Sequence, residues 1–149
     1  VVYDLGQNYH DGLHLVALRR CTLNLIVATA EKSTANEMEQ AVKDLKACVN
    51  YSDIRFRLVL NKWDDRLGVD AREVVERLGL SEYGRVPYGS DMKVDLSLNY
   101  SKPMVLEKPN EVSEAIIALI SGFYSPIEKM WQQKGGAKRK RGFELFGRR

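Results

Sequence analysis

Two groups of residues in this chain have the types and spacing for nucleotide chemistry. The first is Asp4, near the end of the apolar segment 1–5, and Gly6, which directly follows that segment. An aspartate at the end of a buried strand can hold a magnesium ion, usually through water, because hard oxygen ligands suit that ion. A glycine two residues later lets the backbone approach a γ-phosphate. The alternative is an ordinary aspartate that caps the turn after its strand.

The second group is the sequence Asn-Lys-Trp-Asp at residues 61–64. The planar amide of Asn61 offers a donor and an acceptor side by side, which suits the edge of a purine base. Together with Lys62 and Asp64 it also matches the pattern Asn-Lys-x-Asp, with which GTPases read guanine. The alternative is a polar turn that ends a strand, with Asp64 as a cap.

A third segment, residues 86–91, has a proline and a glycine where a strand is expected to end. Backbone groups exposed by Pro87 and Gly89 could cradle a base or a ribose, although a plain turn before a helix has the same composition. His10 and His14 lie four residues apart, but no third ligand with metal spacing accompanies them, and we expect no metal site there.

These residues must be positioned by alternating strands and helices. Such an alternation predicts an α/β fold with a mostly parallel sheet, flanked by helices and covered on both faces. Ligands of such sheets bind beyond the carboxyl ends of the strands. The expected strands are residues 1–5, 23–28, 55–60 and 83–87, and the expected helices are 13–20, 34–49, 70–78, 92–99 and 110–124.

Details of sequence predict how several elements begin, end and face the core. Ser33 or Thr34 is the expected cap of the second helix, and Asp70 and Gly79 are the expected ends of the third. Phe123 closes the apolar stripe of the last helix and is predicted to face inward. The chain has two cysteines, Cys21 and Cys48, which we interpret as buried thiols. Neither a membrane-spanning stretch of about 20 apolar residues nor a signal peptide is visible.

The last segment of the chain differs sharply in charge from the rest. Residues 134–149 hold seven lysines or arginines against one acidic residue, so their net charge is +6 while residues 1–133 sum to −3. Apolar rings beside such cations suit an anchor at an anionic membrane surface. A disordered basic tail that contacts nucleic acid is the alternative. We therefore divide the chain into 1–126 and a basic linker and tail, 127–149, whose membrane-binding candidates are Lys138, Arg139, Lys140, Arg141, Phe143, Leu145 and Phe146.

Taken in order, five segments resemble the ParA/MinD group of deviant P-loop ATPases, most closely the MinD-like, CpaE-type proteins of pilus assembly. The resemblance covers residues 1 to about 124 and implies a partial P-loop NTPase fold. Two positions depart from the family pattern, with Ala30 in place of a proline and Gly89 in place of an aspartate. The segments are Asp-Leu-Gly at 4–6, Val-Ala-Thr-Ala-Glu at 27–31, Val-Leu-Asn-Lys at 59–62, Val-Pro-Tyr-Gly at 86–89 and Lys-Pro-Met-Val-Leu at 102–106.

The resemblance implies roles for individual residues. Asp4 would lie beside Mg²⁺ and Gly6 near the γ-phosphate, as the catalytic pair. The adenine base of ATP would be bound by residues at the ends of the expected strands 55–60 and 83–87. These nucleotide-binding residues are Asn61, Lys62, Asp64, Pro87 and Tyr88.

The resemblance also implies a spatial-positioning function in bacteria, for a pilus, secretion or division apparatus. Such proteins form homodimers with ATP, act in the cytoplasm at the inner face of the membrane, and bind a protein partner. The family's loop Lys-Gly-Gly-x-Gly-Lys-Thr is missing from these residues, so we expect this chain to be the C-terminal part of the domain. We expect ATP and Mg²⁺ to require the missing N-terminal part, and this chain alone to bind nucleotide poorly and to hydrolyse none. A non-catalytic adaptor and a GTPase fragment are the alternatives.

Overall fold

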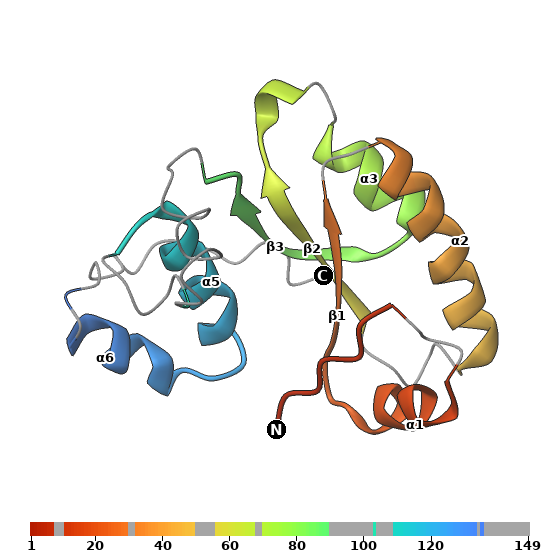
Figure 1. The fold of residues 1–149 in the computed structure, drawn as a ribbon, viewed down its shortest axis with the longest axis horizontal. Helices are drawn as coiled ribbons and strands as arrows, with labels where there is room; N and C mark the ends of the chain where they lie inside the picture. The colour runs from red at the N-terminus through yellow and green to blue at the C-terminus, as the bar shows by residue number, and fades with distance from the viewer. Residues whose placement is uncertain are drawn as a thin grey trace. The chain divides into compact units, whose positions relative to one another are not determined.

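The computed structural model describes residues 1–7, 11–29, 32–49, 56–67, 70–89, 103, 109–133 and 135. The chain divides into two compact units, Val1–Tyr88 and Gly89–Arg149 (Figure 1). The first unit contains α1 (Gly12–Arg20), β1 (Asn24–Thr29), α2 (Lys32–Cys48), β2 (Phe56–Trp63), the 3-10 helix η2 (Asp65–Leu67), α3 (Ala71–Leu78) and β3 (Ser81–Pro87). The second contains α5 (Glu111–Ser121) and α6 (Pro126–Gln133).

The sheet of the first unit confirms the predicted α/β class. Its three strands run parallel in the order β1-β2-β3. Parallel neighbours require a crossover, and α2 and α3 supply the two crossovers, from β1 to β2 and from β2 to β3. Each of the three strands was predicted from the sequence, although β2 extends three residues farther than expected.

One face of the sheet carries the hydrophobic core. Ala28 of β1 and Leu58 and Leu60 of β2 are almost completely buried there. Burying a leucine or valine side chain contributes about 1.5–3 kcal/mol, so this cluster dominates the stability of the unit. The helices add Leu18 of α1, Val42 and Leu45 of α2, and Ala71, Val74 and Leu78 of α3 to the same cluster.

The opposite face of β1 is open. Leu25 is 38% exposed and Val27 is 56% exposed. All three helices of this unit contribute to the single core cluster described above, so none of them is left for this side. The expectation that β1 is covered on both faces was therefore wrong for the described residues.

The expected first strand is absent. Residues 1–5 adopt no regular structure, and Val1, Val2 and Tyr3 are exposed. A strand is stabilised by hydrogen bonds to a neighbour, and no described strand pairs with this segment. An apolar run alone was not enough to predict a strand here.

Helix ends follow local capping, with one correction. The Asp70 side chain accepts a hydrogen bond from the backbone N–H of Arg72, and Gly79 ends α3 in the left-handed conformation with φ 58°, as predicted. The helix α2 already includes residues 33 and 34, because it begins at Lys32, so the expected cap there was wrong. Capping by Asp11 starts α1 at Gly12.

The second unit contains a helix pair that the sequence predicted only in part. The helix α5 starts with a capping box between Asn110 and Ser113 but ends at Ser121, and Phe123 is 50% exposed instead of facing inward. A proline at the first position suits a helix start, and α6 begins at Pro126 where a linker was expected. The indole of Trp131 is buried and donates to Glu114 over 2.9 Å, which joins α6 to α5.

Several predictions fall outside the described residues or on their margins. The expected helix 92–99 and the tail residues 136–149 are outside them. Cys48 is exposed and Cys21 is half-buried, so the expectation of two buried thiols was wrong. Among the described residues, no helix is long and apolar enough to cross a membrane.

Candidate functional site

The carboxyl ends of the strands bring the predicted base-binding residues together. Thr29 at the end of β1 pairs with Asn61 of β2, and Trp63 of β2 pairs with Pro87 at the end of β3. Because side chains alternate along a strand, Thr29 and Asn61 lie on the face opposite to Leu60 and the core. Both side chains are half-buried. The amide of Asn61 therefore lies at a sheet edge where ligands of parallel sheets bind.

The strand β2 changes direction immediately after Asn61. Lys62 has φ 51°, and among the described residues it alone combines a side chain with a positive φ. This conformation costs about 1–2 kcal/mol for a residue with a Cβ atom. The pairing of β2 with β3 is irregular between Leu60 and Trp63, which includes this position. Backbone strain of this kind is often found at functional sites.

Trp63 stabilises the strained segment. Its side chain is only 6% exposed and belongs to the core cluster. The indole N–H donates to the carboxylate of Asp65 over 2.7 Å, and the guanidinium carbon of Arg85 lies 5.5 Å from the ring centroid. The Trp63 carbonyl accepts a hydrogen bond of 2.8 Å from the backbone N–H of Tyr88. These contacts join the end of β2 to the end of β3.

Asp64 is occupied by an arginine two residues later. The Arg66 guanidinium donates to both oxygens of the Asp64 carboxylate, over distances from 2.6 to 3.1 Å. The backbone N–H of Arg66 donates to the same carboxylate over 2.9 Å. Hydrogen bonds from the Arg66 side chain, followed by the one from its backbone, lower the pKa of Asp64 to about 2. Asp64 is therefore a charged, fully engaged carboxylate at neutral pH.

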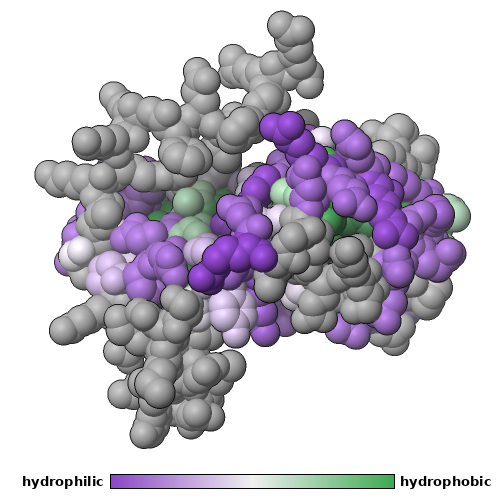
Figure 2. Space-filling model, turned by 90° about the horizontal axis from the view of Figure 1, so that it is seen from above, coloured by the Kyte–Doolittle hydropathy of each residue, from purple (hydrophilic) through white to green (hydrophobic). Residues whose placement is uncertain are grey.

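Tyr88 provides an exposed aromatic ring next to these residues. It follows β3 directly and is 54% exposed, whereas Pro87 is half-buried. The view from above in Figure 2 looks toward this end of the first unit, and the described surface there is mainly hydrophilic. Five predicted residues thus lie on two adjacent strand ends: Asn61, Lys62, Asp64, Pro87 and Tyr88.

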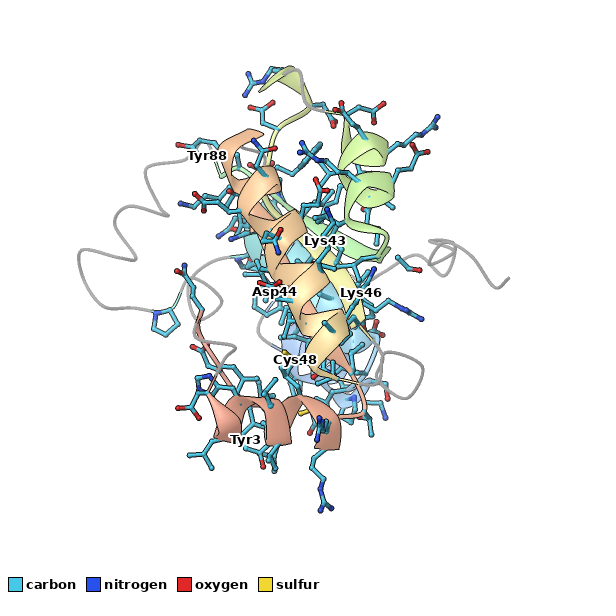
Figure 3. All side chains as sticks on the ribbon, turned by 90° about the vertical axis from the view of Figure 1, so that its right-hand side faces the viewer. Tyr3, Lys43, Asp44, Lys46, Cys48 and Tyr88 are labelled. Carbon is cyan, nitrogen blue, oxygen red and sulfur yellow. The ribbon has the colours of Figure 1, made fainter. Side chains whose placement is uncertain are left out.

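The structure does not bring Asp4 and Gly6 to this place. Tyr3, the neighbour of Asp4, and Tyr88 lie at opposite ends of the first unit (Figure 3). The Asp4 carboxylate accepts a hydrogen bond of 3.2 Å from the backbone N–H of Gly6, which has φ 58°. This geometry matches the alternative of an aspartate that caps its own turn.

The structure does not test magnesium coordination by Asp4, because a single carboxylate can hold this ion together with water and phosphate oxygens. No group of three or more His, Cys, Asp or Glu side chains that could hold a metal occurs among the described residues. The assignment of Asp4 and Gly6 to magnesium and γ-phosphate remains a prediction from the resemblance.

Three functional neighbours of Asn61 were not predicted from sequence. Trp63 stood at the variable position of the Asn-Lys-x-Asp pattern, and Arg66 and Arg85 stood outside every motif. The spacing of Asp64 and Arg66 could have indicated their pairing, because an aspartate often bonds to the backbone two residues later. The contact of Arg85 with Trp63 depends on the pairing of β2 with β3, which sequence spacing does not specify.

Comparison with known proteins supports the fold. No protein-family model matches the chain, and no curated protein matches it significantly. Among solved structures, the chain resembles the MinD cell division protein of Aquifex aeolicus with 19% identity and a TM-score of 0.57, covering 89% of this chain and 52% of that one. It resembles a ParA family ATPase from Chlorobium tepidum TLS with 16% identity and a TM-score of 0.61, covering 77% and 46%.

The MinC:MinD cell division protein complex of Aquifex aeolicus gives a similar match, with 16% identity, a TM-score of 0.57, and 92% and 50% of the two chains covered. The chain thus spans about half the length of the proteins that it matches. At this level of identity the likeness establishes a shared fold. It agrees with the resemblance to ParA and MinD proteins that the five sequence segments indicated.

Proposed function

We propose that this chain is part of a MinD/ParA-like ATP-binding protein in which Asn61 reads the adenine base. Support comes mainly from the meeting of Asn61, Pro87 and Tyr88 at adjacent strand ends, on a fold shared with MinD and ParA proteins. The amide of Asn61 can donate to one adenine nitrogen and accept from the amino group. Tyr88 offers a ring on which the base can stack.

The proposed biological role is spatial positioning of a pilus, secretion or division apparatus, as in MinD-like and CpaE-type proteins. ATP would favour a homodimer, and the dimer would favour the membrane-bound state, because a ligand shifts a protein toward the state that it binds better. The basic tail, residues 134–149, would hold the protein at the inner face of the cytoplasmic membrane. Because the loop Lys-Gly-Gly-x-Gly-Lys-Thr does not occur among these residues, we assign no hydrolytic step to this chain alone.

Asn61→Ala tests the base assignment directly. Loss of a bidentate amide–base contact costs about 1–3 kcal/mol, so ATP affinity should fall about 5- to 150-fold. Binding is measured by calorimetry or by NMR titration of the chain with ATP. Gln40→Ala is the matched control, because it removes an amide that bonds to Asp44 on α2. Equal ATP affinity of Asn61→Ala and the control would show that Asn61 does not read the base.

Removal of residues 134–149 tests the membrane assignment. The truncated chain should no longer sediment with vesicles that contain anionic lipid, because basic residues near such a surface contribute about 1 kcal/mol each. Neutral vesicles serve as the control and should bind neither form. If the truncated chain still sediments with anionic vesicles, the tail is not the anchor.

A non-catalytic adaptor is the second candidate function. Two departures from the family pattern favour it, Ala30 in place of a proline and Gly89 in place of an aspartate. An adaptor would bind its protein partner with the same affinity in the presence and absence of ATP. A partner affinity that does not change when ATP is added would favour this candidate over the first.

A further inference from the structure

We infer that Arg66 sets the base preference of the proposed site, because it holds the Asp64 carboxylate out of reach of a purine. This inference rests on the proposed nucleotide function. It concerns the choice between adenine and guanine, which the Asn-Lys-x-Asp pattern alone leaves open. Arg66 is a specificity-determining residue in this proposal and need not touch the base.

The chemistry of the two bases explains why the carboxylate matters. Guanine presents a ring N–H and an amino group side by side, and the two oxygens of a free carboxylate accept from both. Adenine presents an unprotonated ring nitrogen instead, so a carboxylate facing it gains no second hydrogen bond. An available Asp64 would therefore favour guanine, whereas the neutral amide of Asn61 suits adenine.

The geometry removes Asp64 from this role. The Arg66 guanidinium spans the carboxylate, with Nε 2.9 Å from Oδ1 and 3.1 Å from Oδ2, and Nη2 2.6 Å from Oδ2. Both oxygens thus accept from one planar fork, the arrangement that makes arginine–carboxylate pairs specific in orientation. The backbone N–H of Arg66 occupies Oδ1 as well.

The neighbouring acidic residue is also engaged. Asp65 accepts from the indole N–H of Trp63, which is anchored in the core. Asp65 therefore does not replace Asp64 as a guanine reader without breaking that contact. Both carboxylates that follow Asn61 on this segment have partners within the segment itself.

Exposure limits the size of the effect. The side chain of Arg66 is 82% exposed and that of Asp64 is 17% exposed. Because the arginine of this pair lies mostly in solvent, the pair is weak and is screened by salt. We therefore expect that releasing Asp64 changes base preference by about two- to five-fold, and that the change decreases at high ionic strength.

The experiment is an NMR titration of the full chain with AMP and, separately, with GMP at millimolar concentrations. The wild-type chain should bind AMP more tightly than GMP. In Arg66→Ala the ratio of the two affinities should fall about two- to five-fold, through stronger GMP binding. The pKa of the Asp64 carboxyl, followed by its carbon shift, should rise from about 2 toward its ordinary value.

Two variants serve as controls. Arg72→Ala removes an exposed cation from α3 and should leave the AMP to GMP ratio unchanged. Asp64→Asn in the Arg66→Ala background removes the released charge and should restore the wild-type ratio. An effect shared by Arg66→Ala and Arg72→Ala would mean a general loss of positive charge, and would overturn the inference.

The outcomes separate this inference from the proposed function. If AMP binds but Arg66→Ala leaves the ratio unchanged, the nucleotide function stands and the inference about Arg66 is overturned. An unchanged Asp64 pKa in Arg66→Ala overturns it independently of any nucleotide. If neither AMP nor GMP binds the wild-type chain, the assignment of Asn61 to the base fails and the inference about Arg66 fails with it.

Discussion

Trp63 links the hydrophobic core to the candidate site. Its ring lies in the core cluster, while its backbone belongs to the strained segment after Asn61. A change at this residue therefore affects both stability and the position of Asn61. The contact explains how a left-handed residue, Lys62, is maintained at the end of a strand, since the surrounding packing offsets the strain.

Substitution of Trp63 should be strongly destabilising. Trp63→Ala is expected to lower the free energy of unfolding by about 3–5 kcal/mol, because it leaves a large cavity. Trp63→Phe should cost less, since it retains a ring but loses the hydrogen bond to Asp65. Guanidinium unfolding followed by circular dichroism measures both. Tyr88→Ala is the control, and a comparable loss of stability there would contradict the assignment.

At the scale of residues, the sequence predicted those site positions that depend on a strand end. Asn61, Pro87 and Tyr88 lie at the ends of two predicted strands, and the carboxyl ends of parallel strands meet at one edge. Asp4 was predicted by the same logic, but its segment has no pairing partner among the described strands. The contacts of Trp63 and Arg66 depend on the backbone direction after Asn61, and an apolar pattern contains no information about that direction.

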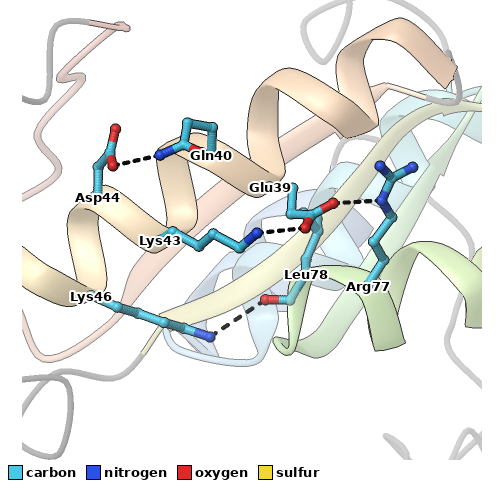
Figure 4. A network of polar contacts seen from close by, with 7 residues as sticks. All are labelled: Glu39, Gln40, Lys43, Asp44, Lys46, Arg77 and Leu78. Atoms are coloured by element: carbon cyan, nitrogen blue, oxygen red, sulfur yellow. Dashed lines mark hydrogen bonds and ion pairs between the residues drawn. The ribbon is translucent and has the colours of Figure 1, made fainter.

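At the scale of elements, one carboxylate ties α2 to α3. Glu39 accepts from Lys43 on its own helix and from Arg77 on α3, each over 2.7 Å (Figure 4). Nearby, the ammonium of Lys46 lies 3.5 Å from the carbonyl oxygen of Leu78, near the end of α3. Hydrogen bonds from Lys43 and then Arg77 lower the pKa of Glu39 below its ordinary value of 4.5.

The lowered pKa predicts a pH-dependent contribution to stability. A carboxyl with a lower pKa in the folded state stabilises the fold above its unfolded pKa, and this contribution is lost as pH falls through the folded pKa. Glu39→Gln should therefore lower the urea midpoint at pH 7, and the difference from wild type should shrink below about pH 4. Glu37→Gln, on the same helix and outside this network, is the control. A constant difference between pH 7 and pH 3 would exclude the ionic contribution.

The end of α3 provides a second test at this scale. Gly79→Ala places a Cβ atom at φ 58°, which should cost about 1–2 kcal/mol of unfolding free energy. The added atom meets only the flexible end of Lys46, 3.3 Å away, so conformation and not crowding causes the loss. Gly12→Ala is the matched control, because its Cβ meets nothing within 4 Å and its φ is not positive. Equal losses in urea unfolding would contradict this explanation.

The order of elements was predictable, but several of their limits were not. Periodicity distinguishes strands from helices because their side chains repeat every 2 and 3.6 residues. It does not reveal that β2 continues to Trp63, since that extension depends on pairing with Pro87. It also missed α6, whose helical start at Pro126 was interpreted as an end.

At the scale of the molecule, β1 is an edge strand of the described sheet, and one of its faces is exposed. The described sheet ends there, and the chain matches about half the length of its structural neighbours. The strand has no charged residue and no proline, the features with which proteins protect an edge. Together with exposed Leu25 and Val27, this composition favours association through β1.

We therefore expect the isolated chain to self-associate, and expect Val27→Lys to reduce the association. Val27 is 56% exposed, so a lysine is tolerated by the fold, while its charge opposes pairing along the edge. Sedimentation velocity over a range of concentrations measures the change. Val16→Lys, on the exposed side of α1, is the control for added charge. If both variants associate like the wild type, or if the wild type remains monomeric, the open side of β1 does not drive association.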